Sequence, residues 1–224
     1  MQKHITPRAS LISEYTFIAY FFIVSFFPFD ADIIKLLCLL TFIGCWVTKM
    51  LSEKKIRFVK TSLTIPILSF FLCSLIASLH SVRIRYSLGT IESDYLEYFT
   101  IFFCMVNTIQ GQEQIRRIVK AMLITCGLVC AYGLYGYYTG IAIRDERLVA
   151  TFEYHSRIAK YISLFLPIAV CLFFHYKNVL TRLYLVILTI VCSISLILTM
   201  NRTSWVAVLV AMFFIGFAAQ KKLL

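Results

Sequence analysis

Long apolar runs separated by short polar connections are the feature that most restricts how this 224-residue chain can fold. The runs recur along the whole sequence and leave no stretch from which a soluble domain could be built. Charged residues make up only 15% of the chain, against about 25% in a typical globular domain, and the mean hydropathy is +0.84. The sequence therefore predicts an all-α, polytopic transmembrane helix bundle, with residues 1–224 forming a single integral membrane domain.

The positions of the apolar runs predict about eight spans. In chain order they are Tyr15–Phe29, Ile33–Val47, Leu63–Leu79, about Tyr95–Ile109, a fifth ending near Tyr138, Ile158–Phe174, Leu183–Met200 and a last one from Trp205 to Lys221. Some are shorter than the roughly 20 residues that a perpendicular crossing needs, so we expect neighbouring helices or snorkelling polar ends to shield them. For the charged segment His80–Glu97, an interfacial helix before a short fourth span is favoured over a span that begins near Tyr86.

The distribution of charge predicts the orientation of the bundle. If the spans alternate and the N-terminus is cytoplasmic, the inner side receives 14 of the 22 Lys and Arg residues and 3 of the 11 acidic ones, which accounts for the whole formal net charge of +11. An excess of Lys and Arg on the cytoplasmic side is the usual rule. The basic residues form no patch with interleaved aromatics, so we expect membrane lipid and no nucleic acid as a partner.

With this orientation, two polar segments face outward. The first is RDERLVATFEYHSRIAK (Arg144–Lys160), and the second is the pair Asn201 and Arg202, which we expect to form a minimal turn between two apolar helices. A serine or glycine would serve in such a turn at lower cost. The outward arginines are therefore candidates for binding a phosphate or pyrophosphate, whose oxygens the guanidinium fork binds bidentately. They are Arg83, Arg85, Arg144, Arg147, Arg157 and Arg202.

Two plainer explanations of these arginines stay open at this point. Arg202 could snorkel to the phosphates of membrane lipids. Asp145, Glu146 and Glu153 could pair with the arginines of the first segment in an ordinary solvated loop. His155 is a candidate proton shuttle, although a single histidine in a loop is more often incidental.

No catalytic residue, cofactor or metal site is predicted from the residue pattern. The eight cysteines all lie inside apolar runs, without CxxC pairs or neighbouring histidines, and we expect them to pack between helices as small apolar side chains. Cys126 and Cys130 are four residues apart, which is helical spacing. The carboxylates of Glu92, Asp94 and Glu97 are interpreted as interfacial, because no partner motif accompanies them.

Three passages of the chain resemble the bacterial O-antigen ligase and polymerase family. YGLYGYYTG (Tyr132–Gly140) resembles the glycine-aromatic end of one of its spans, and RLVATFEYHSRIAKY (Arg147–Tyr161) resembles an arginine followed by Gly-Thr-Phe and a short polar stretch. TMNRTSWVA (Thr199–Ala207) is similar to the family's Ser-Arg-Gly-x-Trp turn before a helix. The chain departs from these patterns at Ala150, Ser156, Asn201 and Thr203.

The resemblance implies a membrane glycosyltransferase in the bacterial cytoplasmic (inner) membrane. Its donor would be a glycan linked to undecaprenyl pyrophosphate, and its acceptor a lipid or a growing glycan. Arg202 would contact the donor pyrophosphate and Arg147 would line the same outer cavity, while Arg157, Arg83 and Arg85 are added because of their charge and predicted side. The family's essential histidine lies in a large outer loop, which we expect beyond Leu224, so the chain is expected to be an N-terminal portion that is inactive alone.

Two other functional classes remain as alternatives. Outward arginines would also suit a transporter or a lipid-handling protein for a phosphorylated substrate, for which an inverted internal repeat would argue; the sequence shows no convincing repeat. A non-catalytic membrane subunit is the third possibility.

Overall fold

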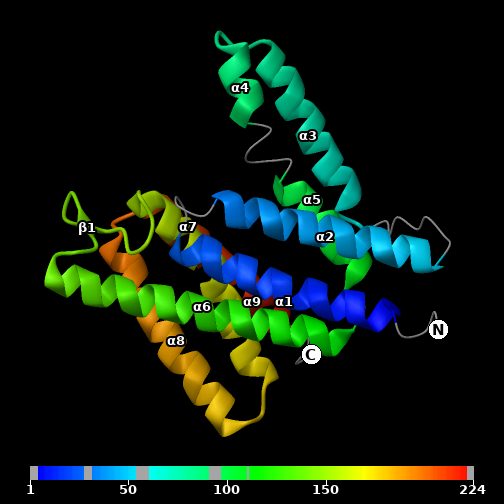
Figure 1. Cartoon of the computed structure of the whole chain (residues 1–224). Coiled ribbons are helices and arrows are strands. Elements are labelled where there is room, and N and C mark those ends of the chain that lie inside the picture. Colours follow the sequence, from blue (N-terminus) through cyan, green and yellow to red (C-terminus); the bar gives the residue numbers. More distant parts are fainter. Residues whose placement is uncertain (1–4, 28–31, 54–60, 91–96, 110, 221–224) are drawn as a thin grey trace. The chain divides into compact units, whose positions relative to one another are not determined.

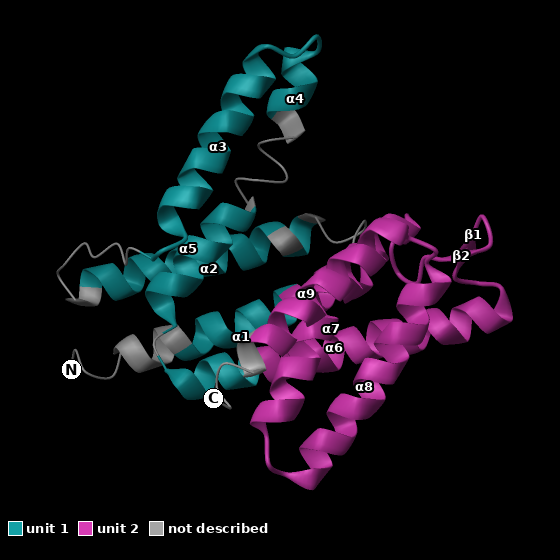
Figure 2. Ribbon diagram, turned by 180° about the vertical axis from the view of Figure 1, so that it is seen from behind, with its two compact units in different colours: residues 1–20, 32–118 teal, residues 21–31, 119–224 magenta. Residues whose placement is uncertain are grey.

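The computed structural model describes residues 5–27, 32–53, 61–90, 97–109 and 111–220 (Figure 1). Contacts between residues divide the chain into two compact units (Figure 2). Unit 1 comprises Met1–Tyr20 and Asp32–Ile118, and unit 2 comprises Phe21–Ala31 and Val119–Leu224. Helices account for most of the described residues, which confirms the predicted all-α class.

Three helices are long and apolar enough to cross a membrane: α6 (Gln112–Thr139), α7 (His155–His175) and α8 (Val179–Leu198). The other apolar helices contain shorter apolar stretches of 10–17 residues. These helices are α1 (Ile5–Phe26), α2 (Asp32–Glu53), α3 (Thr64–Leu79), α5 (Glu97–Thr108) and α9 (Arg202–Gln220). Each predicted span thus coincides with a helix, whereas the number of membrane crossings and their orientation remain predictions.

In unit 1, α2 packs against α5, and α3 packs against the short helix α4 (Ile84–Thr90). The charged segment before the predicted fourth span therefore contains a helix, and its interfacial position stays a prediction. The predicted interfacial carboxylates Glu92 and Asp94 lie outside the described residues. Phe42 is fully buried, and its ring lies 6.4 Å from that of Phe17 between centroids.

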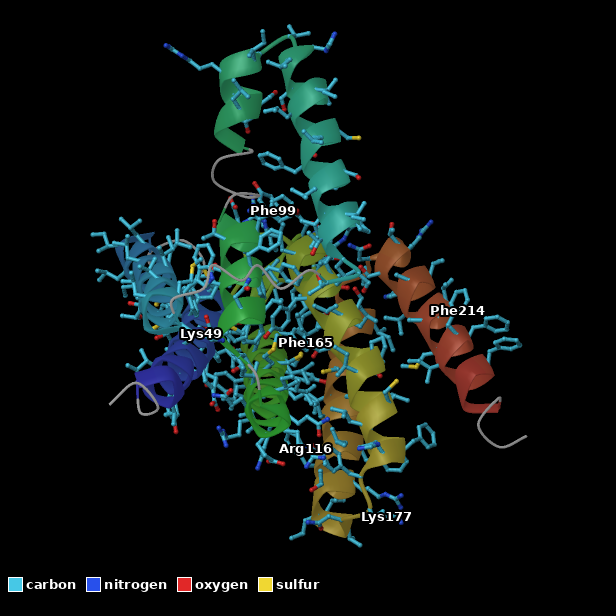
Figure 3. All side chains as sticks on the ribbon, turned by 90° about the vertical axis from the view of Figure 1, so that its right-hand side faces the viewer. Lys49, Phe99, Arg116, Phe165, Lys177 and Phe214 are labelled. Atoms are coloured by element: carbon cyan, nitrogen blue, oxygen red, sulfur yellow. The ribbon has the colours of Figure 1, made fainter. Side chains whose placement is uncertain are left out.

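Unit 1 also contains buried charged groups that form hydrogen bonds with other residues of the chain. The buried carboxylate of Glu14 accepts two hydrogen bonds from Arg117, at 2.5 Å from Nε and 2.8 Å from Nη2. The ammonium group of the buried Lys49 donates to the backbone carbonyl of Asn107 (Figure 3). Pairing of this kind compensates for the loss of hydration when a charge is buried.

Unit 2 is built around α7, which packs against both α8 and α9. The turn between α7 and α8 is short, and Asn178 caps α8 by accepting a hydrogen bond from the backbone N–H of Leu180 at 3.1 Å. The core of the unit comes from α6, α7, α8, the connection between α6 and α7, and Val208 of α9. Its fully buried members include Cys126, Val129, Leu148, Ile158, Ile162 and Leu185.

The course of the chain brings several helix ends together at one end of unit 2. Since α8 runs back along α7 and α9 again packs on α7, the start of α7, the end of α8 and the start of α9 share that end. The connection that follows α6 joins them there, because it leads directly into α7. Lys177, in the turn between α7 and α8, marks the opposite end, with Phe165 between the two (Figure 3).

Candidate pyrophosphate site

The site begins with a hairpin that folds back onto the end of α6. Its strands are β1 (Ile143–Arg144) and β2 (Arg147–Leu148), and β2 contacts α8 (Figure 1). Asp145 and Glu146 form the tip, with φ angles of 52° and 60°. Positive φ at both central residues is what a two-residue hairpin turn with the correct twist requires. The tip therefore consists of two exposed carboxylates.

Two glycines of α6 allow this hairpin to lie close to the helix. A Cβ atom on Gly136 would come within 2.4 Å of the Cβ of Ala142, and one on Gly133 within 2.8 Å of the Cβ of Ala150. The backbone N–H of Ala142 also donates to the carbonyl of Gly136 at 3.0 Å. The glycine-aromatic end of this helix therefore serves to dock the hairpin.

Arg147 and His155 contact each other across the connection. Nη1 of Arg147 lies 3.0 Å from Nε2 of His155, the first residue of α7. The guanidinium can only donate, so Nε2 is the acceptor in this contact. The sequence offered His155 as either a proton shuttle or an incidental residue. In the structure its Nε2 contacts the half-buried Arg147, and a role as a proton shuttle stays a prediction.

Tyr154 organises the other two arginines of the segment. The guanidinium carbon of Arg144 lies 5.1 Å from the centre of the Tyr154 ring, and that of Arg157 lies 5.8 Å from it. Both distances are within the range of a cation–π interaction. Arg144 also donates to the carbonyl of Glu153 at 3.2 Å. Among the described residues, Arg144 forms no ion pair with Asp145, Glu146 or Glu153.

The rest of the segment is fixed to the interior of unit 2. Thr151 donates its hydroxyl hydrogen to the backbone carbonyl of Ser25 at 2.6 Å, and Ser25 Oγ lies 3.2 Å from the hydroxyl of Tyr161 on α7. The ring of Tyr161 lies 5.4 Å from that of Phe152 and 4.9 Å from that of Phe165. These contacts anchor the C-terminal part of the segment Arg144–Lys160.

Arg202 lies at the start of α9, and here one sequence prediction is wrong. We expected Asn201 and Arg202 to share the turn, but the turn is made one residue earlier. Met200 adopts φ 51°, which reverses the chain after α8, and Asn201 caps α9 by accepting from the backbone N–H of Ser204 at 3.3 Å. Arg202 is consequently the first residue of the helix.

The exposed Arg202 side chain makes no hydrogen bond or ion pair with any described residue. The N-terminal end of a helix carries a partial positive charge, so an arginine there is repelled by about 0.3–1 kcal/mol. The neighbouring Trp205 is, in contrast, well fixed, since its Nε1 donates to the carbonyl of Leu196 at 3.0 Å. A turn that is fixed by hydrogen bonds thus presents a cation that the described residues do not neutralise.

We name this group the arginine end of unit 2: Arg144, Arg147, Arg157 and Arg202, with the starts of α7 and α9. The topology brings together three of the five predicted site residues, Arg147, Arg157 and Arg202. The first turn of α7 has no side-chain cap on its N–H groups. Guanidinium groups and helix N-termini both favour anions.

The other two predicted site residues belong to unit 1. Arg83 precedes α4 and Arg85 lies in its first turn, and both side chains are exposed. The backbone N–H of Arg83 donates to the hydroxyl of Ser81 at 3.2 Å. Their participation in the site remains a prediction.

Sequence reasoning missed two groupings. The bond between Arg147 and His155 requires the hairpin, and the only signal for it was their separation by eight residues around a Thr-Phe motif. A group of three cysteines also forms, from two helices that are far apart in the sequence. Spacing within one helix could reveal Cys126 and Cys130 but not the third, Cys192.

No family model, curated protein or solved structure matches this chain. Its function is therefore argued from the arginine end and from the motif resemblance alone.

Proposed function

We propose that unit 2 binds a lipid-linked pyrophosphate at its arginine end. We further propose that the chain belongs to a membrane glycosyltransferase of the O-antigen ligase or polymerase type. The donor would be a glycan on undecaprenyl pyrophosphate, bound at the outer face of a bacterial cytoplasmic membrane, and the acceptor a lipid or a growing glycan.

The observation that carries the proposal is the state of Arg202. Its guanidinium has no partner among the described residues and stands at the unfavourable end of a helix. A bound anion would remove both disadvantages, because it would accept hydrogen bonds from the guanidinium and interact favourably with the helix N-terminus. Arg147 and Arg157 supply further positive charge at the same end of unit 2.

The chemistry of glycosyl transfer suits such a group. When the bond between the anomeric carbon and the pyrophosphate oxygen breaks, negative charge develops on the pyrophosphate leaving group. Preorganised cations that are aimed at this charge lower the barrier more than they stabilise the bound donor. Arg147 is preorganised by its bond to His155, which accepts at Nε2, so that nitrogen is engaged. The proposal therefore assigns His155 to positioning Arg147 and not to removing the proton of the acceptor.

The membrane orientation is part of the proposal. The end of unit 2 that contains Lys177 and the exposed Arg182 would face the cytoplasm, in agreement with the excess of basic residues predicted there. The arginine end would then lie at the outer surface, where a flipped lipid-linked donor presents its pyrophosphate.

Binding of the donor tests the proposal without requiring transfer. The purified chain, reconstituted in lipid nanodiscs, should bind undecaprenyl pyrophosphate more tightly than undecaprenyl monophosphate. Arg202→Ala should weaken pyrophosphate binding by about 30-fold, which corresponds to about 2 kcal/mol. Arg182→Ala is the matched control, since it removes an exposed arginine from the opposite end of the unit, and it should bind as the unchanged chain does.

Two results would count against the proposal. Equal binding by Arg202→Ala and Arg182→Ala would mean that the arginine end does not form the site. If a soluble sugar phosphate displaced the lipid with similar affinity, the alternative of a transporter for a phosphorylated substrate would be favoured over a glycosyltransferase.

A further inference from the structure

Three cysteines converge inside unit 2, away from the arginine end. Cys126 and Cys130 lie one turn apart on α6, and Cys192 reaches them from α8. The Sγ atom of Cys192 is 3.8 Å from the Sγ of Cys126 and 3.8 Å from that of Cys130, and all three sulfur atoms lie within 4.8 Å of one another. All three side chains are buried, with exposed fractions of 0%, 0% and 1%.

The spacing of the sulfur atoms fits a metal ion at their centre. Metal–thiolate bonds are about 2.3 Å long, so an ion in the plane of three sulfur ligands holds them roughly 4 Å apart. The two distances to Cys192 are close to this value. Two of the cysteines lie on one face of a helix and the third faces them from another helix, so the three sulfur atoms form a triangle. A disulfide would join only two of these atoms and leave the third unbonded.

The number and type of ligands indicate which ion would fit. Thiolates select soft ions, chiefly Cu(I) and Zn(II), and structural zinc sites have four ligands in a tetrahedron. Among the described residues the group offers three such ligands, without a histidine or carboxylate as a fourth. From this geometry we propose that Cys126, Cys130 and Cys192 form a three-coordinate site for Cu(I).

Binding at this site replaces protons by the metal. Each cysteine that binds as a thiolate releases one proton to solvent, so affinity for Cu(I) rises with pH. No change of oxidation state is required if the ion arrives as Cu(I) and the thiols are reduced. Without metal, the same thiols pack as small apolar groups in the core, which is compatible with their burial.

The site has a defined structural consequence. A bound ion joins α6 to α8, the two helices that lead into the hairpin and into the α8–α9 turn. It would therefore stabilise unit 2 independently of any pyrophosphate. Because the cysteines are distinct from the arginines that bind the donor in the proposed function, the two proposals can fail separately.

The test uses the whole chain in detergent micelles, under anaerobic conditions with the thiols reduced. Competition with a coloured Cu(I) chelator should show one tightly bound ion per chain, and Cu(I) should raise the thermal unfolding midpoint. Cys192→Ser should lower the affinity by at least about 100-fold, more than the loss of an outer-shell partner usually causes. Cys171→Ser, which changes an exposed cysteine on α7, is the matched control and should leave the affinity unchanged.

Several results would overturn the proposal. They are equal losses in Cys192→Ser and Cys171→Ser, the absence of a bound ion, and tighter binding of Zn(II) than of Cu(I). If Cys192→Ser does not fold, X-ray absorption on the unchanged chain decides instead. Three sulfur neighbours around copper are expected there, and any other coordination would contradict the three-cysteine site.

Discussion

The two polar elements at the arginine end of unit 2 differ in the contacts that their arginines make with the rest of the chain. In the hairpin segment, Arg144 and Arg157 lie against the ring of Tyr154, and Arg147 donates to His155. At the start of α9, Arg202 has no such partner among the described residues, although the turn that presents it is fixed by hydrogen bonds.

The arginines of the hairpin segment contact other described residues of the fold, whereas Arg202 is exposed without such contacts. Partners within the chain contribute to stability, so the first segment can be explained by folding alone. Arg202 cannot be explained in this way, because its charge is repelled by the helix N-terminus. We infer that Arg202 contributes to binding without contributing to stability, whereas the arginines of the hairpin segment contribute to both. The predictions below are arranged from the largest expected effect to the smallest.

Gly136→Ala should disrupt the packing of the hairpin against α6. The new Cβ would lie 2.4 Å from the Cβ of Ala142 and 3.1 Å from its backbone nitrogen, so the hairpin must move. We expect a loss of about 3 kcal/mol in the free energy of unfolding, as for a severely overpacked core site. Gly216→Ala is the control, since nothing lies within 4 Å of its Cβ position. Thermal unfolding in micelles measures both, and a harmless Gly136→Ala would show that the hairpin is not docked through this glycine.

Arg202→Ala should weaken pyrophosphate binding without lowering the stability of the fold. Affinity for undecaprenyl pyrophosphate should fall by about 30-fold, whereas the free energy of unfolding should rise by about 0.5 kcal/mol because the repulsion with the helix N-terminus is removed. Arg202→Lys should recover only part of the affinity, since an ammonium group lacks the bidentate fork. A clear loss of stability in Arg202→Ala would place this residue in the same architectural class as the hairpin arginines.

The pair Arg147 and His155 should behave as one unit. A double-mutant cycle with Arg147→Ala and His155→Ala should give a coupling energy of about 1 kcal/mol in the free energy of unfolding. In binding measurements, His155→Ala should weaken the pyrophosphate affinity by less than Arg147→Ala does, because it acts only through the arginine. Additive effects on unfolding would show that the bond contributes nothing.

Met200→Gly should stabilise the turn that presents Arg202. Met200 has φ 51° and is half exposed, so glycine removes a strained backbone conformation at little cost in packing. We expect a gain of about 0.5–1 kcal/mol, with unchanged pyrophosphate affinity. Met212→Gly, in the interior of α9, should instead destabilise the protein, and the opposite order of the two variants would contradict the assigned turn.

The sequence predicted the helices well and the contacts between them poorly. Apolar runs located every long helix, because hydrophobicity over some 15 residues is a strong local signal. The turn before α9 was misplaced by one residue, since a methionine with positive φ gives no sequence signal of the kind that glycine gives. The two polar segments share one end of unit 2, as alternating helix directions require, while the predicted outer position of that end stays a prediction.

Other features depend on pairs of residues that no local pattern specifies. The hairpin tip is Asp145-Glu146, which lacks the Asn-Gly or Asp-Gly signal of such turns. Without the hairpin, the approach of Arg147 to His155 could not be predicted. Cys192 lies on α8, 62 residues after the nearer of Cys126 and Cys130, and meets them only in the folded unit.

The most direct test of the central claim is a distance between the donor pyrophosphate and Arg202. Solid-state NMR on the chain in lipid bilayers, with ¹⁵N-labelled arginine and undecaprenyl pyrophosphate, measures dipolar coupling between ³¹P and guanidinium ¹⁵N. Arg202→Lys identifies which arginine gives the signal, and Arg182→Lys is the control. We predict a coupling that corresponds to hydrogen-bonded contact, that is weaker in Arg202→Lys and that is unchanged in Arg182→Lys. An undiminished coupling in Arg202→Lys, or none in the unchanged chain with donor bound, would contradict the assignment of Arg202 to the pyrophosphate.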